Sequence, residues 1–370
     1  MQFIDLHKQQ ERIRTGVHRR IQTVMDHGKY IMGPEVQELE KTLAEFVGIK
    51  HCVGCSSGTD ALLMTLMAWE VGPGDAVFTT PFTFISTAEV IQLLGATPVF
   101  VDIDEKTFNI DPVKLEKVVK NTIDAGELNH KAVITVDLFG LPADYPSIET
   151  IAKKYNLLVL EDAAQSFGAS IGMRKTGSFG DAAATSFFPA KPLGCYGDGG
   201  AIFTDNDDLA EKLHSIRIHG KGSHKYDNIR VGINGRLDTL QAAILLEKFS
   251  IFPEEVDLRN NVAGLYNEKL HNKVQSPFVP DGYTSVWAIY SILTDSEKHR
   301  TEIQERLKGK NIPTAIYYPL PLHLQTAFMG LGFQEGDFPI SEDISQRIFS
   351  LPMHPYLDKA DIKTITELIF

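Results

Sequence analysis

The chain has 370 residues, 43% of them hydrophobic and 23% charged, with three cysteines and a formal net charge of −12. An acidic chain without a run of Lys or Arg argues against nucleic acid and anionic membranes as partners, because both are bound mainly through basic patches. The start of the chain lacks the basic and apolar regions of a signal peptide, no apolar run approaches the ~20 residues that span a bilayer, and three cysteines are too few for a disulfide framework. We therefore expect a cytoplasmic protein.

The predicted elements begin with two helices and then alternate between strands and helices. Apolar residues at helical spacing predict helices at 9–26 and 35–47, with a loop between them. The following alternation predicts an α/β layer on a mostly parallel sheet. Strands are expected at 51–53, 76–80, 98–101, 132–136, 157–160, 182–188 and 201–204, and helices at 59–69, 86–94, 147–155 and 236–249.

The pattern changes near residue 250. Helices are expected at 258–270 and 301–307, a β-like run at 285–293, and a Pro-rich connection at 319–321. We place a large α/β domain at 1–250 and a smaller α+β domain at 251–370. No G-x-G-x-x-G follows the first strand and no G-x-x-x-x-G-K-[ST] is present, which disfavours nicotinamide-dinucleotide and nucleoside-triphosphatase folds.

A Gly-rich loop between the runs 182–188 and 201–204 carries one lysine, Lys191, framed by Pro189 and Pro192. Desolvation lowers the pKa of an ammonium group, and a neutral amine is what Schiff-base chemistry needs. The alternative interpretation is a solvated loop lysine beside glycines that only turn the chain. This stretch by itself leaves both interpretations open.

The segment Ser56-Ser57-Gly58-Thr59-Asp60 joins a predicted strand to a predicted helix. Backbone N–H groups and hydroxyls converge at such a helix N-terminus, which suits a phosphate. The alternative is a simple N-cap by Ser57 or Thr59.

Two further side chains follow predicted strands. Asp162 ends a fully apolar strand, where a bare charge is costly unless it is paired, and a pyridinium N–H is a fitting partner. A structural salt bridge or a turn cap is the alternative. Phe84 follows the strand at 76–80 and could cover a flat ring, although an aromatic at such a place is more often part of the core.

Taken together, a phosphate cradle, an aromatic ring, a buried carboxylate and a Gly-framed lysine specify pyridoxal 5′-phosphate. Lys191 would bind it covalently, Asp162 would keep the ring nitrogen protonated, and Gln165 could hydrogen-bond the ring hydroxyl. Once an incoming amine displaces Lys191, the freed amino group can carry a proton between the substrate carbon and the cofactor. This chemistry is transamination, with pyridoxamine 5′-phosphate as the intermediate form.

These motifs resemble those of the DegT/DnrJ/EryC1/StrS sugar aminotransferases, which have the fold-type I architecture of aspartate aminotransferase. The likeness runs over nearly the whole chain, through Ser57-Gly-Thr-Asp60, Pro81-Phe-Thr-Phe84, Glu161 to Ser166, Ser186 to Gly200 and Arg236 to Gln241. The resemblance implies the following cofactor contacts: Lys191, Asp162 on the ring nitrogen, Gln165 on the ring hydroxyl, Phe84 stacked on the ring, and Gly58, Thr59 and Ser186 on the phosphate.

The resemblance also implies a homodimer, because Asn234 matches a position that reaches the phosphate of the neighbouring subunit's cofactor. Segments that border the sugar-nucleotide pocket in the family place five residues beside the substrate: Tyr30, His219, Arg236, Tyr318 and His323. Lys191 rules out the branch of the family that has histidine at this position and dehydrates sugars.

Within the family, the lysine loop and Leu351 to Leu357 are most similar to enzymes that aminate C3 of a UDP-linked 2-acetamido-2-deoxy-3-keto sugar. The hexuluronate is our first expectation, with glutamate as amino donor and a product that enters surface polysaccharide such as O-antigen. A C6 carboxylate needs a local cation in so acidic a protein. The available cations are Arg230, Arg236, Lys221 and Lys225.

Two alternatives remain open at this point. One is a C4 aminotransferase that acts on a UDP- or dTDP-4-keto-6-deoxy sugar. The other is a non-catalytic regulator that binds pyridoxal phosphate, against which the acidic charge and the lack of a basic helix-turn-helix-like element count.

Overall fold

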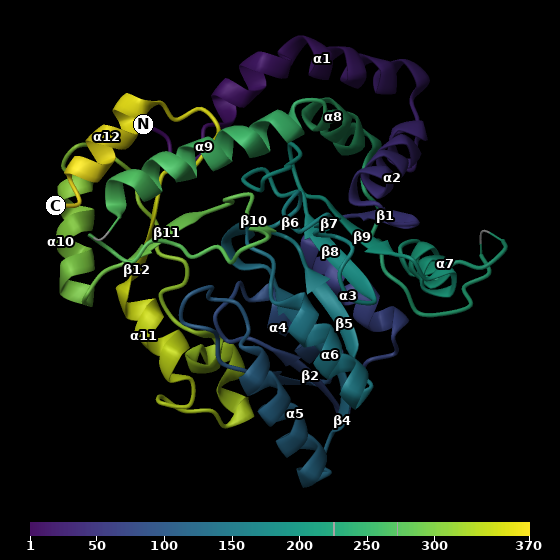
Figure 1. Ribbon diagram of the computed structural model, residues 1–370. Helices are drawn as coiled ribbons and strands as arrows, with labels where there is room; N and C mark the ends of the chain where they lie inside the picture. The colour runs from purple at the N-terminus through teal and green to yellow at the C-terminus, as the bar shows by residue number, and fades with distance from the viewer. Residues whose placement is uncertain (225, 272) are drawn as a thin grey trace.

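The computed structural model describes residues 1–224, 226–271 and 273–370. Within these residues, the main sheet has seven strands in the order β1-β9-β8-β5-β4-β2-β3. The pairs from β8 to β3 are all parallel, whereas β9 runs antiparallel to both β8 and β1. The predicted mostly parallel sheet is therefore confirmed, and Figure 1 shows it at the centre of the molecule.

The strands of this sheet are short and largely buried, because helices cover both faces. Their bounds are β1 (His51–Cys55), β2 (Asp75–Thr79), β3 (Thr97–Phe100), β4 (Asn129–Val136), β5 (Leu158–Asp162), β8 (Ala182–Ser186) and β9 (Gly200–Thr204). A separate three-stranded sheet has β6 (Ser170–Ile171) at its centre, between β10 (Tyr283–Thr284) and β7 (Arg174–Lys175).

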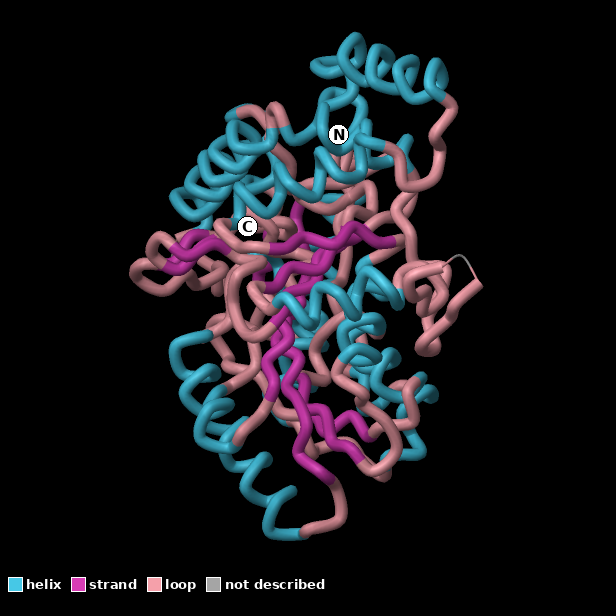
Figure 2. Tube along the Cα trace, turned by 90° about the vertical axis from the view of Figure 1, so that its right-hand side faces the viewer, coloured by secondary structure: helices cyan, strands magenta, loops and turns pink. Residues whose placement is uncertain are grey.

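Helices form a layer on each face of the main sheet, and Figure 2 shows the strands running between them. One face packs against α3 (Gly58–Ala68), α4 (Ser86–Leu93) and α7 (Asp207–Ile216). The other face packs against α2 (Pro34–Val47), α8 (Thr239–Phe249), α5 (Pro112–Ala125) and α6 (Tyr145–Tyr155). The result is the three-layer α/β/α arrangement expected of fold type I.

The N-terminal helix α1 (Leu6–His27) lies outside these layers and packs on α8 through Ile13 and Val17. Between α1 and α2 the chain turns at Gly28, whose φ of 66° is left-handed. Pro34 then starts α2 at a position where a missing N–H costs nothing. These signals explain why a loop separates the two predicted helices.

The C-terminal part of the chain lies to one side of the main sheet (Figure 1). It contains α9 (Phe252–Leu270), α10 (Glu297–Lys308), α11 (Pro339–Arg347) and α12 (Lys359–Glu367), with β11 (Tyr290–Leu293) paired to β12 (Ile348–Leu351). The start of α9 packs in the large core through Phe252, and its later turns pack in a separate cluster through Val262 and Tyr266. The division at residue 250 stays a prediction.

Several elements were not predicted: α5, α7, α11, β12 and α12. For α5 the local signals were present, since Asp111 caps its first turn, Pro112 follows, and Gly126 ends it with a φ of 67°. For β12 they were not, because its pairing with β11 joins segments more than fifty residues apart. Among the described residues, no helix is long and apolar enough to cross a bilayer. The cytoplasmic location stays a prediction.

Candidate active site

The predicted cofactor residues follow strands that end at one edge of the sheet. Asp162 is the last residue of β5 and Ser186 the last of β8, while Ser57 caps α3 just after β1. The carboxyl ends of parallel strands meet at one edge, which is where open α/β sheets bind ligands. The Lys191 loop lies between β8 and β9 at the same edge.

Lys191 and Asp162 are close enough to influence each other's charge. Burial lowers the pKa of Lys191, and the nearby Asp162 carboxylate partly offsets that effect. Burial likewise raises the pKa of Asp162, against the opposing effects of a hydrogen bond from Thr87 and the charge of Lys191. A lysine with a lowered pKa reaches its neutral, nucleophilic form more readily.

Thr87 contacts a predicted cofactor residue, and the sequence did not reveal this contact. Its Oγ1 donates to Asp162 Oδ2 at 2.9 Å, and the backbone N–H of Ala164 donates to Asp162 Oδ1 at 3.2 Å. Thr87 lies in the first turn of α4, a helix that follows β2. These two donors fix the carboxylate of Asp162 in one orientation.

Gln165 is held by two neighbours that orient its amide. The backbone N–H of Phe139 donates to Gln165 Oε1 at 2.9 Å, and Gln165 Nε2 donates to Tyr318 Oη at 3.3 Å. Since the carbonyl oxygen accepts from the backbone, the amide nitrogen faces Tyr318. The structure thus brings two of the predicted residues, Gln165 and Tyr318, into direct contact.

The proposed phosphate turn contains both the N-cap of α3, which is Ser57, and a closely packed glycine, Gly58. Ser57 Oγ accepts from the backbone N–H of Asp60 at 3.0 Å, so the N-cap interpretation holds. A Cβ atom on Gly58 would lie 2.7 Å from the Cβ of Ser186, which requires glycine there. Thr59 Oγ1 lies 2.8 Å from Ser86 Oγ. Three predicted phosphate contacts, Gly58, Thr59 and Ser186, are therefore neighbours.

The lysine loop is folded by its own backbone and anchored to α8. Lys191 N–H donates to the carbonyl of Phe188 at 2.9 Å, and Cys195 N–H donates to the carbonyl of Phe187 at 2.7 Å. The side chain of Gln241 accepts from Tyr196 N–H at 2.9 Å and donates to the Tyr196 carbonyl at 3.4 Å. This double contact fixes the loop that carries Lys191.

Four other predicted residues lie at the surface: Phe84, Tyr30, His219 and Asn234. The side chain of Phe84 is 57% exposed, and Tyr30 is 49% exposed. An exposed Phe84 is free to cover a ring, and exposed side chains can meet a substrate or a second subunit. Their individual roles stay predictions.

His323 differs from these four because it is buried. Its ring has no exposed surface, its Nε2 lies 3.0 Å from Glu342 Oε1, and its ring packs edge-on against Phe338. A side chain with no exposed surface cannot contact a sugar nucleotide unless its neighbours move. The structure gives His323 a place inside the segment that follows Tyr318.

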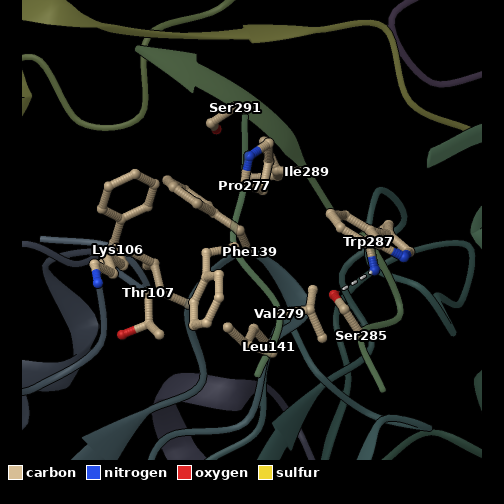
Figure 3. Close-up of a pocket in the computed structure, with 13 residues that line it drawn as sticks. Lys106, Thr107, Phe139, Leu141, Pro277, Val279, Ser285, Trp287, Ile289 and Ser291 are labelled. Atoms are coloured by element: carbon tan, nitrogen blue, oxygen red, sulfur yellow. Dashed lines mark hydrogen bonds between the residues drawn. The ribbon is translucent and has the colours of Figure 1, made fainter. Parts of the chain in front are cut away.

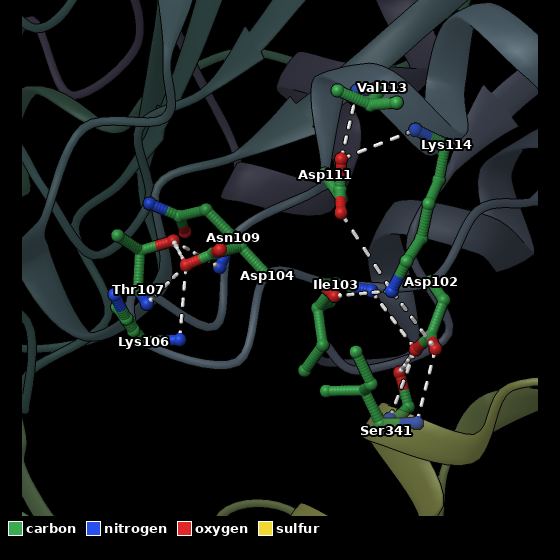
Figure 4. Close-up of polar contacts among 11 residues, drawn as sticks. Asp102, Ile103, Asp104, Lys106, Thr107, Asn109, Asp111, Val113, Lys114 and Ser341 are labelled. Atoms are coloured by element: carbon green, nitrogen blue, oxygen red, sulfur yellow. Dashed lines mark hydrogen bonds and ion pairs between the residues drawn. The ribbon is translucent and has the colours of Figure 1, made fainter.

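Two carboxylates hold the chain between Tyr318 and the start of α11. Glu342 accepts from the backbone N–H groups of Gly336 and Phe338. Asp102 accepts at the start of α11 from Ser341 N–H at 3.0 Å and from its Oγ at 2.6 Å (Figure 4). Asp102 follows β3, so this contact ties the C-terminal part of the chain to the edge of the main sheet.

Two of the four predicted cations, both arginines, offer unpaired nitrogen atoms. Among the described residues, Arg230 Nη1 and Arg236 Nε are buried without a hydrogen-bond partner. Arg236 forms a β-bridge with Cys55, directly before the phosphate turn. Lys221 is exposed, and Lys225, the fourth predicted cation, lies outside the described residues.

A small cavity is lined in part by Phe139. Its volume is only about 20 Å³, and its walls include Leu141, Trp287 and Ile289 (Figure 3). It has room for little more than one water molecule, far below the size of a cofactor or a sugar. The cavity is therefore not the substrate site.

Comparison with known proteins agrees with this geometry. Residues 11–370 match the DegT/DnrJ/EryC1/StrS aminotransferase family. The chain belongs to this family. It is 48% identical over 366 residues to the UDP-2-acetamido-2-deoxy-3-oxo-D-glucuronate aminotransferase of Pseudomonas aeruginosa, covering 99% of this chain and 98% of that protein.

Further relatives agree in sequence and in fold. The UDP-N-acetyl-3-dehydro-α-D-glucosamine 3-aminotransferase of Acidithiobacillus ferrooxidans is 38% identical, over 99% of this chain and 96% of that protein. The crystal structure of a DegT/DnrJ/EryC1/StrS aminotransferase from Brucella abortus superposes with a TM-score of 0.97 at 49% identity, covering 100% of this chain and 98% of that chain. The predicted fold type I and the predicted aminotransferase activity are confirmed.

The cofactor of this aminotransferase is pyridoxal 5′-phosphate. NtdA from Bacillus subtilis, 29% identical with a TM-score of 0.87 over 96% of this chain and 82% of that chain, was solved with bound pyridoxamine phosphate. The residues present here fit the group. A glycine whose Cβ would collide with Ser186 leaves room for a phosphate, and Asp162 offers a buried carboxylate that no arginine or lysine salt bridge occupies among the described residues.

Proposed function

We propose that this aminotransferase moves the amino group of glutamate to C3 of a UDP-linked 2-acetamido-2-deoxy-3-keto sugar, with the hexuluronate as first substrate. The observation that carries the proposal is the 48% identity, over 99% of the chain, to an enzyme named for the 3-oxo-glucuronate. The relative named for the neutral 3-dehydro-glucosamine supports the same carbon at 38% identity. The product would enter surface polysaccharide, and the reaction would take place in the cytoplasm.

The roles of the side chains follow from their contacts. When bound, pyridoxal phosphate supplies an electron-accepting ring that stabilises negative charge on the substrate carbon. Lys191 would hold the cofactor and would carry a proton during the reaction, for which its lowered pKa suits it. Asp162, a carboxylate oriented by Thr87, would pair with the ring nitrogen. Gln165, held by Phe139 and Tyr318, would hydrogen-bond the ring hydroxyl.

The phosphate contacts are neutral groups. We assign them to the N-terminus of α3 at Gly58 and Thr59 and to Ser186, with Asn234 of a second subunit. Exposed apolar side chains support a homodimer in which they would be covered, since Phe84, Phe188 and Val231 are 57%, 53% and 84% exposed. Tyr30 and His219 are assigned to the substrate, Tyr318 to Gln165 and the substrate, and His323 to support of the Tyr318 segment.

The dimer assignment can be tested by mixing two inactive variants. Lys191→Ala and Asn234→Ala are purified separately, unfolded together, refolded as a mixture, and assayed for amino transfer. If Asn234 acts across subunits, hybrid dimers contain one intact site and activity returns. If each variant stays inactive in the mixture although hybrids form by native mass spectrometry, Asn234 does not act on its neighbour's cofactor.

We assign the C6 carboxylate to Arg236, because its buried Nε is unpaired among the described residues and its backbone lies beside the phosphate turn. Hydrogen bonds to charged groups contribute about 1.5–3 kcal/mol, so Arg236→Gln should lower kcat/KM for the uronate by about 10- to 100-fold. The neutral 3-keto sugar should lose far less. Lys221→Gln is the matched surface control. Equal losses on both sugars would remove Arg236 from carboxylate recognition.

The regiochemistry is tested with a panel of nucleotide sugars and glutamate as donor. Because 3-keto sugars are unstable, the dehydrogenase that forms them is coupled into the assay. We expect amination at C3, identified by NMR of the product, with the uronate preferred over the neutral sugar. Amination of 4-keto-6-deoxy sugars alone would replace the proposal with the C4 enzyme. If glutamate leaves the absorbance of the bound cofactor unchanged, a non-catalytic regulator becomes the better assignment.

A further inference from the structure

Two carboxyl groups that the proposed chemistry does not use lie next to the cofactor edge. Asp137 directly follows β4, and Glu161 precedes Asp162 in β5; neither has any exposed surface. The strand register places them near each other, since Thr135 lies opposite Glu161 and Asp137 is two residues further along on the same face. Each of the two groups acts on the pKa of the other. Two carboxyl groups at this spacing can hydrogen-bond to each other only if one of them carries a proton.

The other partners of Asp137 are neutral donors. Its Oδ1 accepts from the backbone N–H of Ala143 and from the hydroxyl of Tyr145, both at 2.8 Å. Its Oδ2 accepts from Ser166 Oγ at 2.7 Å. All of these groups are buried, so they are hydrogen bonds from which water is excluded.

Glu161 is surrounded in the same way. Its Oε1 accepts from the N–H of Gly177 at 2.8 Å and its Oε2 from the N–H of Phe179 at 2.9 Å. Within the described part of the chain, no Lys, Arg or His forms an ion pair with Asp137 or Glu161. Burial without a cation raises the pKa of Asp137 to about 7 and raises that of Glu161 well above its usual value.

Asp137 is also bonded to both ends of the turn that carries the cofactor residues. Its backbone N–H donates to the carbonyl of Asp162 at 3.1 Å, and its side chain binds Ser166. The residues between these two contacts include Gln165. The strand register puts Thr135 opposite Glu161, which fixes the pair relative to this turn.

We propose that Asp137 and Glu161 share one proton and form a positioning pair that holds the turn 162–166, and with it the polar atoms of Asp162 and Gln165 that face the cofactor. The proposal rests on the roles given to Asp162 and Gln165 under the proposed function. Without the shared proton, two carboxylates in contact repel each other in a region of low dielectric constant. The turn that Asp137 holds then shifts.

Among the described residues, two tyrosines are affected by the charge of this pair. Tyr145 comes from α6, and Tyr283 comes from β10, with Asp144 also acting on Tyr283. Burial raises the pKa of Tyr145 well above its usual value and that of Tyr283 to about 12. Both tyrosines stay neutral between pH 6 and 9. A titration of cofactor affinity within that range therefore reports the protonation of Asp137 and Glu161. The contribution of Lys191 is present in wild type and in the variants alike, so a comparison between them removes it.

The test compares Asp137→Asn with Asp137→Leu in the full-length protein. The amide of D137N can donate to Glu161 in place of the shared proton, so we expect its dissociation constant for pyridoxal phosphate at pH 7, from equilibrium dialysis, to stay within threefold of wild type. D137L cannot hold Ser166 or Glu161, so we expect at least tenfold weaker binding. As the pH rises from 6.5 to 9, wild type should lose affinity relative to D137N by at least threefold.

Infrared spectroscopy of the apoenzyme reads the proton directly. The C=O band of a protonated carboxyl should be present in wild type at pH 7 and absent from D137N. Asp75→Asn is the matched control, because Asp75 is a buried acid at the opposite end of β2 that accepts from Gly72 N–H at 3.0 Å. D75N should retain both the band and the cofactor affinity of wild type.

The outcomes separate this inference from the proposed function. Absence of the carboxyl band in wild type at pH 7 overturns the shared proton, even if D137L does not fold. Wild-type cofactor affinity in D137L overturns the positioning role. The cofactor affinity of Asp162→Asn is measured in parallel. If D162N binds the cofactor as wild type does, the assigned role of Asp162 is wrong. If D162N binds the cofactor more weakly while D137L binds it as wild type does, only the proposed role of the Asp137–Glu161 pair is refuted.

Discussion

Removal of the Thr87 hydroxyl should weaken cofactor binding through Asp162. Thr87 Oγ1 donates to Asp162 Oδ2 at 2.9 Å, and both residues are buried. Thr87→Val keeps the shape of the side chain but leaves that oxygen without its donor. A hydrogen bond to a charged group contributes about 1.5–3 kcal/mol, and loss of the Thr87 hydrogen bond raises the pKa of Asp162 further.

This rise in pKa has a calculable effect on affinity. More of the Asp162 population is protonated at neutral pH in Thr87→Val, and a protonated carboxyl does not stabilise a protonated ring nitrogen. The same energy converts to cofactor binding that is about 10- to 100-fold weaker. The measurement is a titration of the apoenzyme with pyridoxal phosphate, followed by visible absorbance at several values of pH.

The stability of the Thr87→Val apoenzyme should change with pH in a defined direction. The folded-state pKa of Asp162 is raised, so the folded chain binds more protons than the unfolded chain, and stability falls as pH rises toward that pKa. Because Thr87→Val raises the folded-state pKa of Asp162 further, the stability of this variant should keep falling up to a higher pH. Thr83→Val is the control, since Thr83 contacts Thr87 at 3.3 Å and not Asp162. Equal affinities for Thr87→Val, Thr83→Val and wild type would refute this account of Asp162.

Three further changes test other parts of the site. Borohydride reduction should attach the cofactor covalently to the wild-type chain but not to Lys191→Ala, as read by mass spectrometry. Lys191→Ala should also lose the change in cofactor absorbance that glutamate causes; if this change occurred at nearly the wild-type rate, Lys191 would not be the anchor. Gly58→Ala places a Cβ 2.7 Å from that of Ser186 and should weaken phosphate binding at least tenfold in dialysis, whereas Gly264→Ala, with open space around it, should not. Lys248→Met should raise the melting temperature by a few degrees at pH 7, because burial lowers the pKa of Lys248 to about 8 and wild type carries the cost of a buried charge. That gain should shrink from pH 8 to about 10, where the folded wild-type lysine is neutral and the unfolded one is still protonated; a gain that does not change with pH would contradict the assigned cause.

The sequence predicted the parts of the fold that depend on local patterns. Alternation of strands and helices identified the parallel sheet, and the ends of its strands identified Asp162 and the phosphate turn, because chain direction alone brings these ends to one edge. Thr87 was missed since a threonine in the first turn of a helix is ordinary. Asp137 was missed because its proposed role depends on its closeness to Glu161. That closeness follows from the register of β4 against β5, which the sequence of neither strand reveals by itself.

The contrast between the charge of the chain and the charge of its ligands explains how the site is built. A protein with a net charge of −12 must hold the phosphate of its cofactor, and the groups that we assign to it are a helix N-terminus, a threonine and a serine. Neutral donors aimed at one point bind an anion without the desolvation cost of a buried lysine or arginine. Charged side chains are then needed only where a group changes its charge or its protonation during the reaction. Lys191 and Asp162 act on each other's charge, each with a pKa shifted toward its neutral form by burial, and Asp137 and Glu161 form no ion pair with a Lys, Arg or His among the described residues. The pyridinium of a bound cofactor would offer Asp162 a further positive charge, so cofactor binding and ionisation of Asp162 would favour each other.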